Sequence, residues 1–181
     1  MFSGRPGQRI LLVGQAPGRV EVDQSRPFAG RAGHQLMRWL QRGGFAGEAD
    51  VRNRVYMTSM TTCFPGRTAD GRGDRRPSAR EVSLCAPWLD SVLALLQPRL
   101  VLPVGTVALT RFLPGRSLDD VVGRVFDGDG ADPGPRRHPP LLLPLPHPSG
   151  QSRWLNDPAR AARLELALAL LPRLVSWACA G

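Results

Sequence analysis

Two short polar turns hold the residues of this chain whose types and spacing could do chemistry. One turn reads Gly14-Gln15-Ala16-Pro17-Gly18, and the other reads His147-Pro148-Ser149-Gly150. A glutamine amide can orient a water molecule but cannot accept its proton near neutral pH. A histidine can donate a hydrogen bond to an oxygen that becomes negatively charged as a bond breaks. The two turns therefore hold candidate catalytic side chains.

Each turn follows an apolar run that reads as a buried strand, over residues 10–13 and 141–145. In an open α/β sheet, ligands bind outside the carboxyl ends of the strands. The two turns can therefore converge on one pocket, although more than a hundred residues separate them in the sequence.

The other elements follow from hydrophobic periodicity. Further strands are predicted over residues 55–59 and 100–104, and a long functional loop over 14–31. Helices are predicted over 32–40, 106–113 and 157–171, and one more begins at a capping box formed by Ser78 and Glu81, bends at Pro87 and ends at Pro98. Alternating strands and helices predict an α/β fold, with a mostly parallel four-stranded central sheet flanked by helices. We expect one domain over residues 1–181, with its core at about 10–172.

The two turns resemble the signature motifs of the uracil-DNA glycosylase superfamily. Three further segments, at residues 26–33, 55–59 and 101–106, resemble blocks of its family 4, in the family order. The resemblance implies a DNA repair enzyme that binds DNA with a damaged base. It implies base binding by Gly14, Ala16, Phe28 and Ser59, with the Phe28 ring stacked on the base. It also implies that Gln15 and His147 are catalytic, and that His147 stabilises the leaving base.

Two positions depart from the family pattern. Gln15 and Ala16 stand where the superfamily has a water-activating acid or Asn, and Ser59 stands where it has a base-pairing Asn. We therefore expect weak activity on uracil. A loop carboxylate, Glu21 or Asp23, could replace the missing base, or both could be solvated acids that pair with arginines.

Contacts to the DNA backbone are predicted at two places. The second turn offers Ser149, Gly150, Ser152 and Arg153. Arg153 or Trp154 could fill the gap left by an extruded base, although Trp154 is as well suited to core packing. A polar loop offers Arg72, Arg75 and Arg76, which either contact phosphates or form a solvated charge run.

The charge balance points to a polyanionic partner. The formal net charge is +9 and the pI about 11.3, which is typical of nucleic-acid binding. All 24 basic residues are Arg, so a general arginine bias is the alternative explanation. Without lysine, a Schiff base with a sugar aldehyde is excluded for the side chains. A glycosylase with this sequence should be monofunctional.

The cysteines do not predict a cofactor. Cys63 and Cys85 match two of the four ligands of the iron–sulfur cluster in family 4, and Cys179 is the third cysteine of the chain. Because such clusters take four cysteines, we expect no cluster, and no other metal site. No run has the apolar length of a membrane span, and no signal peptide is visible. We expect a cytoplasmic monomer.

Three functions are compatible with these residues. A monofunctional DNA glycosylase for a deaminated base such as uracil is the first. A catalytically weak or inactive protein that binds damaged or single-stranded DNA is the second, and a nucleoside hydrolase is the third.

Overall fold

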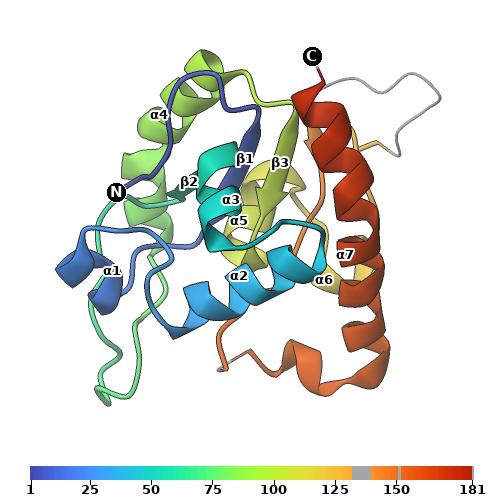
Figure 1. Cartoon of the computed structure of the whole chain (residues 1–181). Coiled ribbons are helices and arrows are strands. Elements are labelled where there is room, and N and C mark those ends of the chain that lie inside the picture. Colours follow the sequence, from blue (N-terminus) through green and yellow to red (C-terminus); the bar gives the residue numbers. More distant parts are fainter. Residues whose placement is uncertain (132–139, 151, 181) are drawn as a thin grey trace.

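The computed structural model describes residues 1–131, 140–150 and 152–180. Its centre is a parallel sheet of four strands in the order β2-β1-β3-β4 (Figure 1). The strands are β1 (Ile10–Gly14), β2 (Val55–Ser59), β3 (Leu100–Pro103) and β4 (Leu141–Leu142). The predicted parallel α/β architecture is therefore confirmed.

Helices cover both faces of the sheet because the strand order reverses after β1. The connection from β1 to β2 carries α2 (Arg31–Arg42) and α3 (Glu48–Arg54), and it runs away from β3. The next connections run in the opposite direction through α4 (Ala79–Leu96), α5 (Gly105–Phe112) and α6 (Leu118–Val121). Right-handed crossovers in opposite directions place their helices on opposite faces, as Figure 1 shows. The last helix, α7 (Pro158–Cys179), packs against α2, β1 and β3.

The apolar runs form strands because both faces of the sheet are covered. The side chains of residues 10–13 in β1 are fully buried. The fourth strand is shorter than predicted, with two paired residues, and one isolated parallel bridge joins Leu145 to Val104. Pro144 lies between these pairings and has no N–H to donate to the ladder.

The start of α4 is held as the sequence predicts. The backbone N–H of Ser78 donates to Glu81 at 2.7 Å, and the Glu81 N–H donates to the Ser78 hydroxyl at 3.3 Å. These two bonds satisfy donors that a helix start leaves without partners.

The helices differ from the prediction in several places. The expected loop over residues 14–31 contains α1 (Arg19–Gln24), and α3 and α6 were not predicted; all three are too short to show helical periodicity. The last helix continues past residue 171, because Pro172 is exposed while Leu174, Val175 and Ala178 extend the buried stripe. The sequence also predicts a Gly/Pro/Asp-rich loop over residues 128–140, and part of that range lies outside the described residues. Among the described helices, none is long and apolar enough to cross a membrane.

Candidate active site

The carboxyl ends of β1, β2 and β3 lie at one level with the segment that continues β4 to Leu145. Gly14 pairs with Ser59 at the ends of β1 and β2. On the other side, the Gly105 N–H donates to the Leu145 carbonyl at 2.9 Å, and Val104 donates to Val13 at 2.9 Å. Gln15 and His147 thus leave the same edge of the sheet. They start from strands that are two spacings apart, roughly 10 Å.

Phe28 lies directly on the first turn. A Cβ added to Gly14 would lie 2.9 Å from Cζ of the Phe28 ring, so only glycine leaves room for the ring there. The Phe28 backbone has a φ of 57°, which is unusual for a bulky residue. The side chain is half-buried and also packs against the core. Phe28 is therefore an anchored ring next to the turn.

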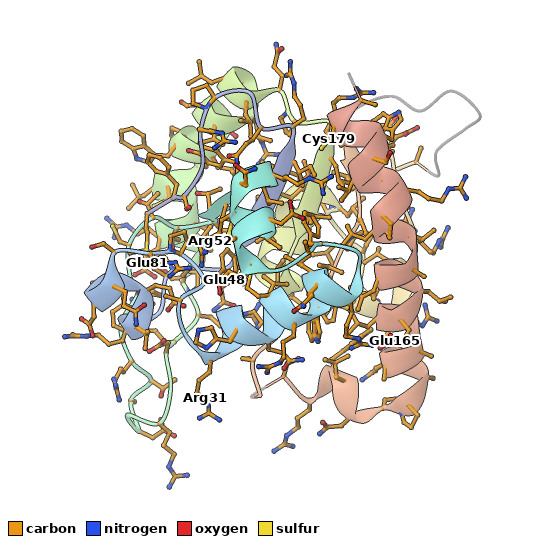
Figure 2. The ribbon with its side chains drawn as sticks, viewed as in Figure 1. Arg31, Glu48, Arg52, Glu81, Glu165 and Cys179 are labelled. Atoms are coloured by element: carbon orange, nitrogen blue, oxygen red, sulfur yellow. The ribbon has the colours of Figure 1, made fainter. Side chains whose placement is uncertain are left out.

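A pair of charged residues on α3 fixes the segment that carries Phe28. Arg52 donates to the Pro27 carbonyl at 3.1 Å and to the Glu48 carboxylate at 2.8 Å. Glu48 also forms an ion pair with Arg26. The hydrogen bond from Arg52 lowers the pKa of Glu48 below its usual range. Figure 2 shows Glu48 and Arg52 next to each other on α3. Sequence reasoning missed this clamp, although the residues stand at i and i+4, the spacing of helical ion pairs.

Glu21 joins the first turn to the Phe28 segment. Its two carboxylate oxygens accept hydrogen bonds from the Gly18 N–H at 3.1 Å and the Gly30 N–H at 2.8 Å. Asp23 forms an exposed ion pair with Arg19 at 3.0 Å. Both acids therefore have structural partners close to the turn.

The side chains at the ends of β1 and β2 have few partners. Gln15 is half-buried, and its amide makes no hydrogen bond with the part of the chain that the structure describes. Ala16 is also half-buried. Ser59 is 7% exposed at the end of β2, beside Gly14. A water molecule or ligand can therefore take up the hydrogen bonds of Gln15.

His147 is held in one tautomer. The Ser149 N–H donates to its Nδ1 at 3.2 Å, and the Ser149 hydroxyl lies 2.8 Å from the same atom. Because a backbone N–H can only donate, Nδ1 is the acceptor in the neutral ring and Nε2 carries the hydrogen. Burial lowers the pKa of His147, and the positive charge of Arg76 lowers it further. The ring is therefore a neutral donor.

The ring of His147 lies against the start of α5. A Cβ added to Gly105, whose φ is 80°, would lie 3.1 Å from both Cβ and Cδ2 of His147. Glycine thus allows an aromatic ring to approach the backbone at the ends of both β1 and β3.

The rest of the second turn leads to the 3₁₀ helix η1 (Arg153–Asn156). Ser149 and Ser152 are half-buried, and Gly150 and Arg153 are exposed, as contacts to a phosphate chain would require. The Trp154 indole N–H donates to Asp119 at 2.9 Å, and its ring packs against the core. Of the two wedge candidates, Arg153 is the exposed one.

The three arginines of the polar loop have different surroundings. The Arg72 side chain is 88% exposed and lies 4.0 Å from Asp70. Arg75 forms a double hydrogen bond with Glu81, at 2.8 and 2.6 Å, and this lowers the pKa of Glu81 to about 2. Arg76 donates to the Thr106 hydroxyl at 2.8 Å. Arg72 is thus the most accessible to a phosphate.

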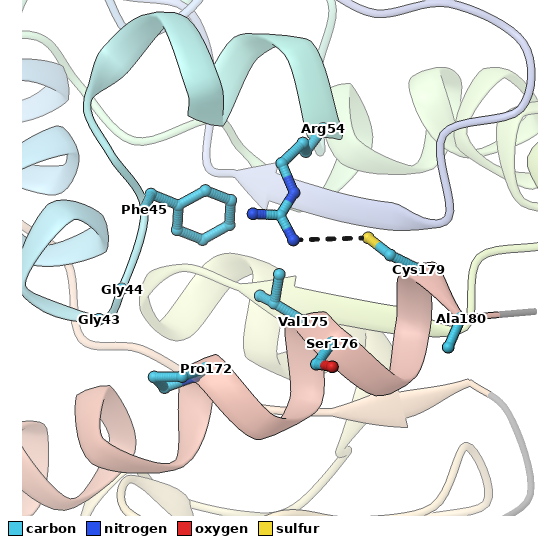
Figure 3. Close-up of a pocket in the computed structure, with 9 residues that line it drawn as sticks. All are labelled: Gly43, Gly44, Phe45, Arg54, Pro172, Val175, Ser176, Cys179 and Ala180. Atoms are coloured by element: carbon cyan, nitrogen blue, oxygen red, sulfur yellow. Dashed lines mark hydrogen bonds between the residues drawn. The ribbon is translucent and has the colours of Figure 1, made fainter.

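The three cysteines do not gather at one place in the described part of the chain. The sulfurs of Cys63 and Cys85 lie 3.9 and 3.8 Å from the Thr62 hydroxyl, so these two are neighbours. Cys179 instead lies 3.8 Å from Arg54, in a hollow of about 320 Å³ at the end of α7 (Figure 3). Within the described residues, no three His, Cys, Asp or Glu side chains form a metal-binding group. None of the predicted site residues lines the hollow.

Comparison with known sequences gives one consistent result. Residues 1–171 match the sequence profile of the uracil DNA glycosylase superfamily. A type-4 uracil-DNA glycosylase of Thermotoga maritima is 31% identical over 164 residues, which are 90% of this chain and 76% of the relative. The type-4 enzyme of Pyrobaculum aerophilum is 32% identical over 124 residues, 66% of this chain. That match spans 58% of the Pyrobaculum protein, a little over half its length.

A solved structure supports the fold. The solution NMR structure of a Methanosarcina acetivorans protein superposes with a TM-score of 0.54. The two chains are 15% identical, and the superposition covers 96% of this chain and 95% of the other.

Proposed function

Because this chain belongs to the uracil-DNA glycosylase superfamily, we propose that it is a monofunctional DNA repair glycosylase, which removes a deaminated base such as uracil. The observation that carries the proposal is the neutral, Ser149-bound His147 at the edge of the sheet that also holds Phe28 and Gln15. The names of the type-4 relatives supply the substrate class.

The reaction that we propose is hydrolysis at the sugar C1′. The bond between C1′ and the base nitrogen breaks, and its electron pair leaves with the base. Water adds to C1′ and loses a proton to solvent, and the base anion then takes up a proton. Gln15 orients that water molecule but does not deprotonate it. The sequence contains no lysine, so no side chain can cleave the abasic strand through a Schiff base.

His147 supplies electrostatic stabilisation in this reaction. Negative charge develops on a carbonyl oxygen of the base as the glycosidic bond breaks, and the Nε2–H of His147 donates to that oxygen. The Phe28 ring stacks on the extruded base, a contact worth roughly 1–3 kcal/mol. Gly14, Ala16 and Ser59 complete the base pocket. Ser149, Gly150, Ser152, Arg153 and Arg72 contact the DNA backbone.

A second candidate is a DNA-binding protein that keeps the pocket without turnover. The specific observation that favours it is the absence of a carboxylate at Gln15 and Ala16, together with the structural partners of Glu21. A nucleoside hydrolase would not need the exposed Arg72 and Arg153. The cytoplasmic location and the monomeric state stay predictions from the sequence.

One assay tests the proposal against both alternatives. Oligonucleotides that carry uracil, hypoxanthine or xanthine are incubated with the protein, as single strands and as duplexes, and alkali-labile abasic sites are measured. Abasic sites on one of these substrates support a glycosylase. Tight binding without abasic sites supports the binding protein, and release from free nucleosides alone supports the nucleoside hydrolase.

A further inference from the structure

The polar loop between β2 and α4 is attached at two points of the candidate site. Asp74 accepts a hydrogen bond from the Arg19 N–H at 3.4 Å, and its carboxylate lies within 2.6 Å of the position of a Gly18 Cβ. Two residues later, Arg76 donates to the Thr106 hydroxyl at 2.8 Å. The loop therefore spans the rim of the site from the first turn to the start of α5.

The second attachment brings a positive charge close to His147. Thr106 follows Gly105, the residue on which the His147 ring lies. Arg76 is exposed and uses one of its five N–H donors on Thr106. Its other N–H groups make no further hydrogen bond within the described residues.

Few other charged groups act on this ring. Two neighbours of the ring, Gly105 and Ser149, are uncharged. The acids around the pocket are bound elsewhere, since Glu21 accepts from Gly18 and Gly30, Asp74 from Arg19, and Glu81 from Arg75. Arg153, on the same turn as the ring, is exposed. Among the described residues, Arg76 is the charged side chain that shifts the pKa of His147.

A neutral histidine and a fixed cation have complementary effects on an anionic leaving group. The histidine donates one hydrogen bond but adds no charge, whereas a guanidinium stabilises an anion through its charge. We infer that Arg76 stabilises the departing base anion next to His147, and that this, rather than a phosphate contact, is its function. The inference rests on the proposed glycosylase function.

Arg76→Gln tests the inference, and Arg72→Gln is the matched control. Both changes remove one positive charge from the same loop, but Arg72 has no contact with Thr106. Single-turnover base release is measured at saturating DNA. Arg76→Gln should slow uracil release by about tenfold, less than the loss of a direct donor, whereas Arg72→Gln should mainly weaken DNA binding. Because fluorine stabilises the base anion, the loss should be smaller for 5-fluorouracil.

A second readout does not depend on activity. The pKa of His147 is measured by NMR titration in the wild type and both variants, with His147→Asn to assign the signal. The pKa should rise in Arg76→Gln and stay unchanged in Arg72→Gln. If it does not rise in Arg76→Gln, the inference is wrong whether or not the wild type releases a base.

The kinetic result separates the two functions of the cation. If Arg76→Gln and Arg72→Gln release the base at equal rates, and the salt dependence of DNA binding decreases equally in both, Arg76 is a phosphate contact and the inference is overturned. If the wild type releases none of the bases, the proposed function fails on its own, and the NMR titration still decides whether Arg76 sets the electrostatic environment of His147.

Discussion

The backbone N–H of Ser149 donates to Nδ1 of His147 at 3.2 Å, and this bond determines what the histidine can do. Protonation of the ring would place a hydrogen on Nδ1, facing a second donor. The bond therefore favours the neutral ring and keeps the hydrogen on Nε2. Burial and the Arg76 charge act in the same direction on the pKa.

The first prediction concerns pH. Base release should fall as the pH drops through the lowered pKa of His147, because protonation breaks the Ser149 contact. The acidic limb of the pH–rate profile should lie below the ordinary histidine pKa of about 6.5. Single-turnover rates measured across pH check this. An acidic limb above that pKa would contradict a neutral histidine.

The folding stability of the protein should also depend on the protonation of His147. The unfolded chain binds a proton at the ordinary histidine pKa, whereas the folded chain binds it only at a lower pH. Stability is therefore full above about pH 6.5 and declines below it, until the pH passes the folded pKa. Denaturant unfolding of the wild type and His147→Asn should show a shallower decline in the variant over that window.

The next prediction concerns Gln15. General base catalysis contributes typically about 10²–10⁴-fold, and a neutral amide cannot supply it. Wild-type release of uracil should be weak, and Gln15→Glu should raise it. Adding Ser59→Asn should increase the preference for uracil, because an amide can pair with both N3–H and O4 of uracil, whereas a hydroxyl pairs less selectively. Strong wild-type activity that disappears in Glu21→Ala or Asp23→Ala would instead identify a loop carboxylate as the base.

The arginines of the polar loop should differ in their effect on DNA binding. The slope of the logarithm of the DNA-binding constant against the logarithm of the salt concentration measures how many phosphates the protein neutralises. Replacing Arg72, Arg75 and Arg76 together should make this slope shallower, by up to about 0.9 for each phosphate of duplex DNA that the variant no longer neutralises. Arg72→Gln should account for most of that change, because Arg75 is paired with Glu81. Binding measured at several salt concentrations tests this. If Arg75→Gln has the larger effect, its ion pair opens when DNA binds.

A further prediction concerns the cysteine pair. Cys63→Ser with Cys85→Ser should leave base release unchanged, because two neighbouring thiols do not hold a four-cysteine cluster. Protein purified without oxygen should contain no stoichiometric iron and show no iron–sulfur absorbance. Bound iron that disappears in the double variant would show that the missing ligands come from elsewhere.

The sheet could be predicted from the sequence because both faces are covered. The run at residues 10–13 is apolar without interruption, and its residues are fully buried. The capping box at Ser78 was also readable, because both partners lie within four residues. Short helices such as α1 and α3 were not, since six or seven residues give no clear period.

The long-range contacts of the site could not be predicted. The motifs identified Phe28 and His147. They did not show that Gly14 lies against the Phe28 ring and Gly105 against the His147 ring. The contact of Arg76 with Thr106 joins residues that are 30 positions apart. Such contacts depend on how the loops cross the rim of the sheet, and local propensity carries no information about that.

The decisive measurement is single-turnover release of base from a uracil-containing oligonucleotide by the wild type and by His147→Ala, with DNA binding measured in parallel. The loss of this donor should slow release by about 10²–10³-fold, by analogy with an oxyanion-hole donor, while DNA affinity barely changes. Normal turnover in His147→Ala would contradict a catalytic role for the histidine and would remove it from the site.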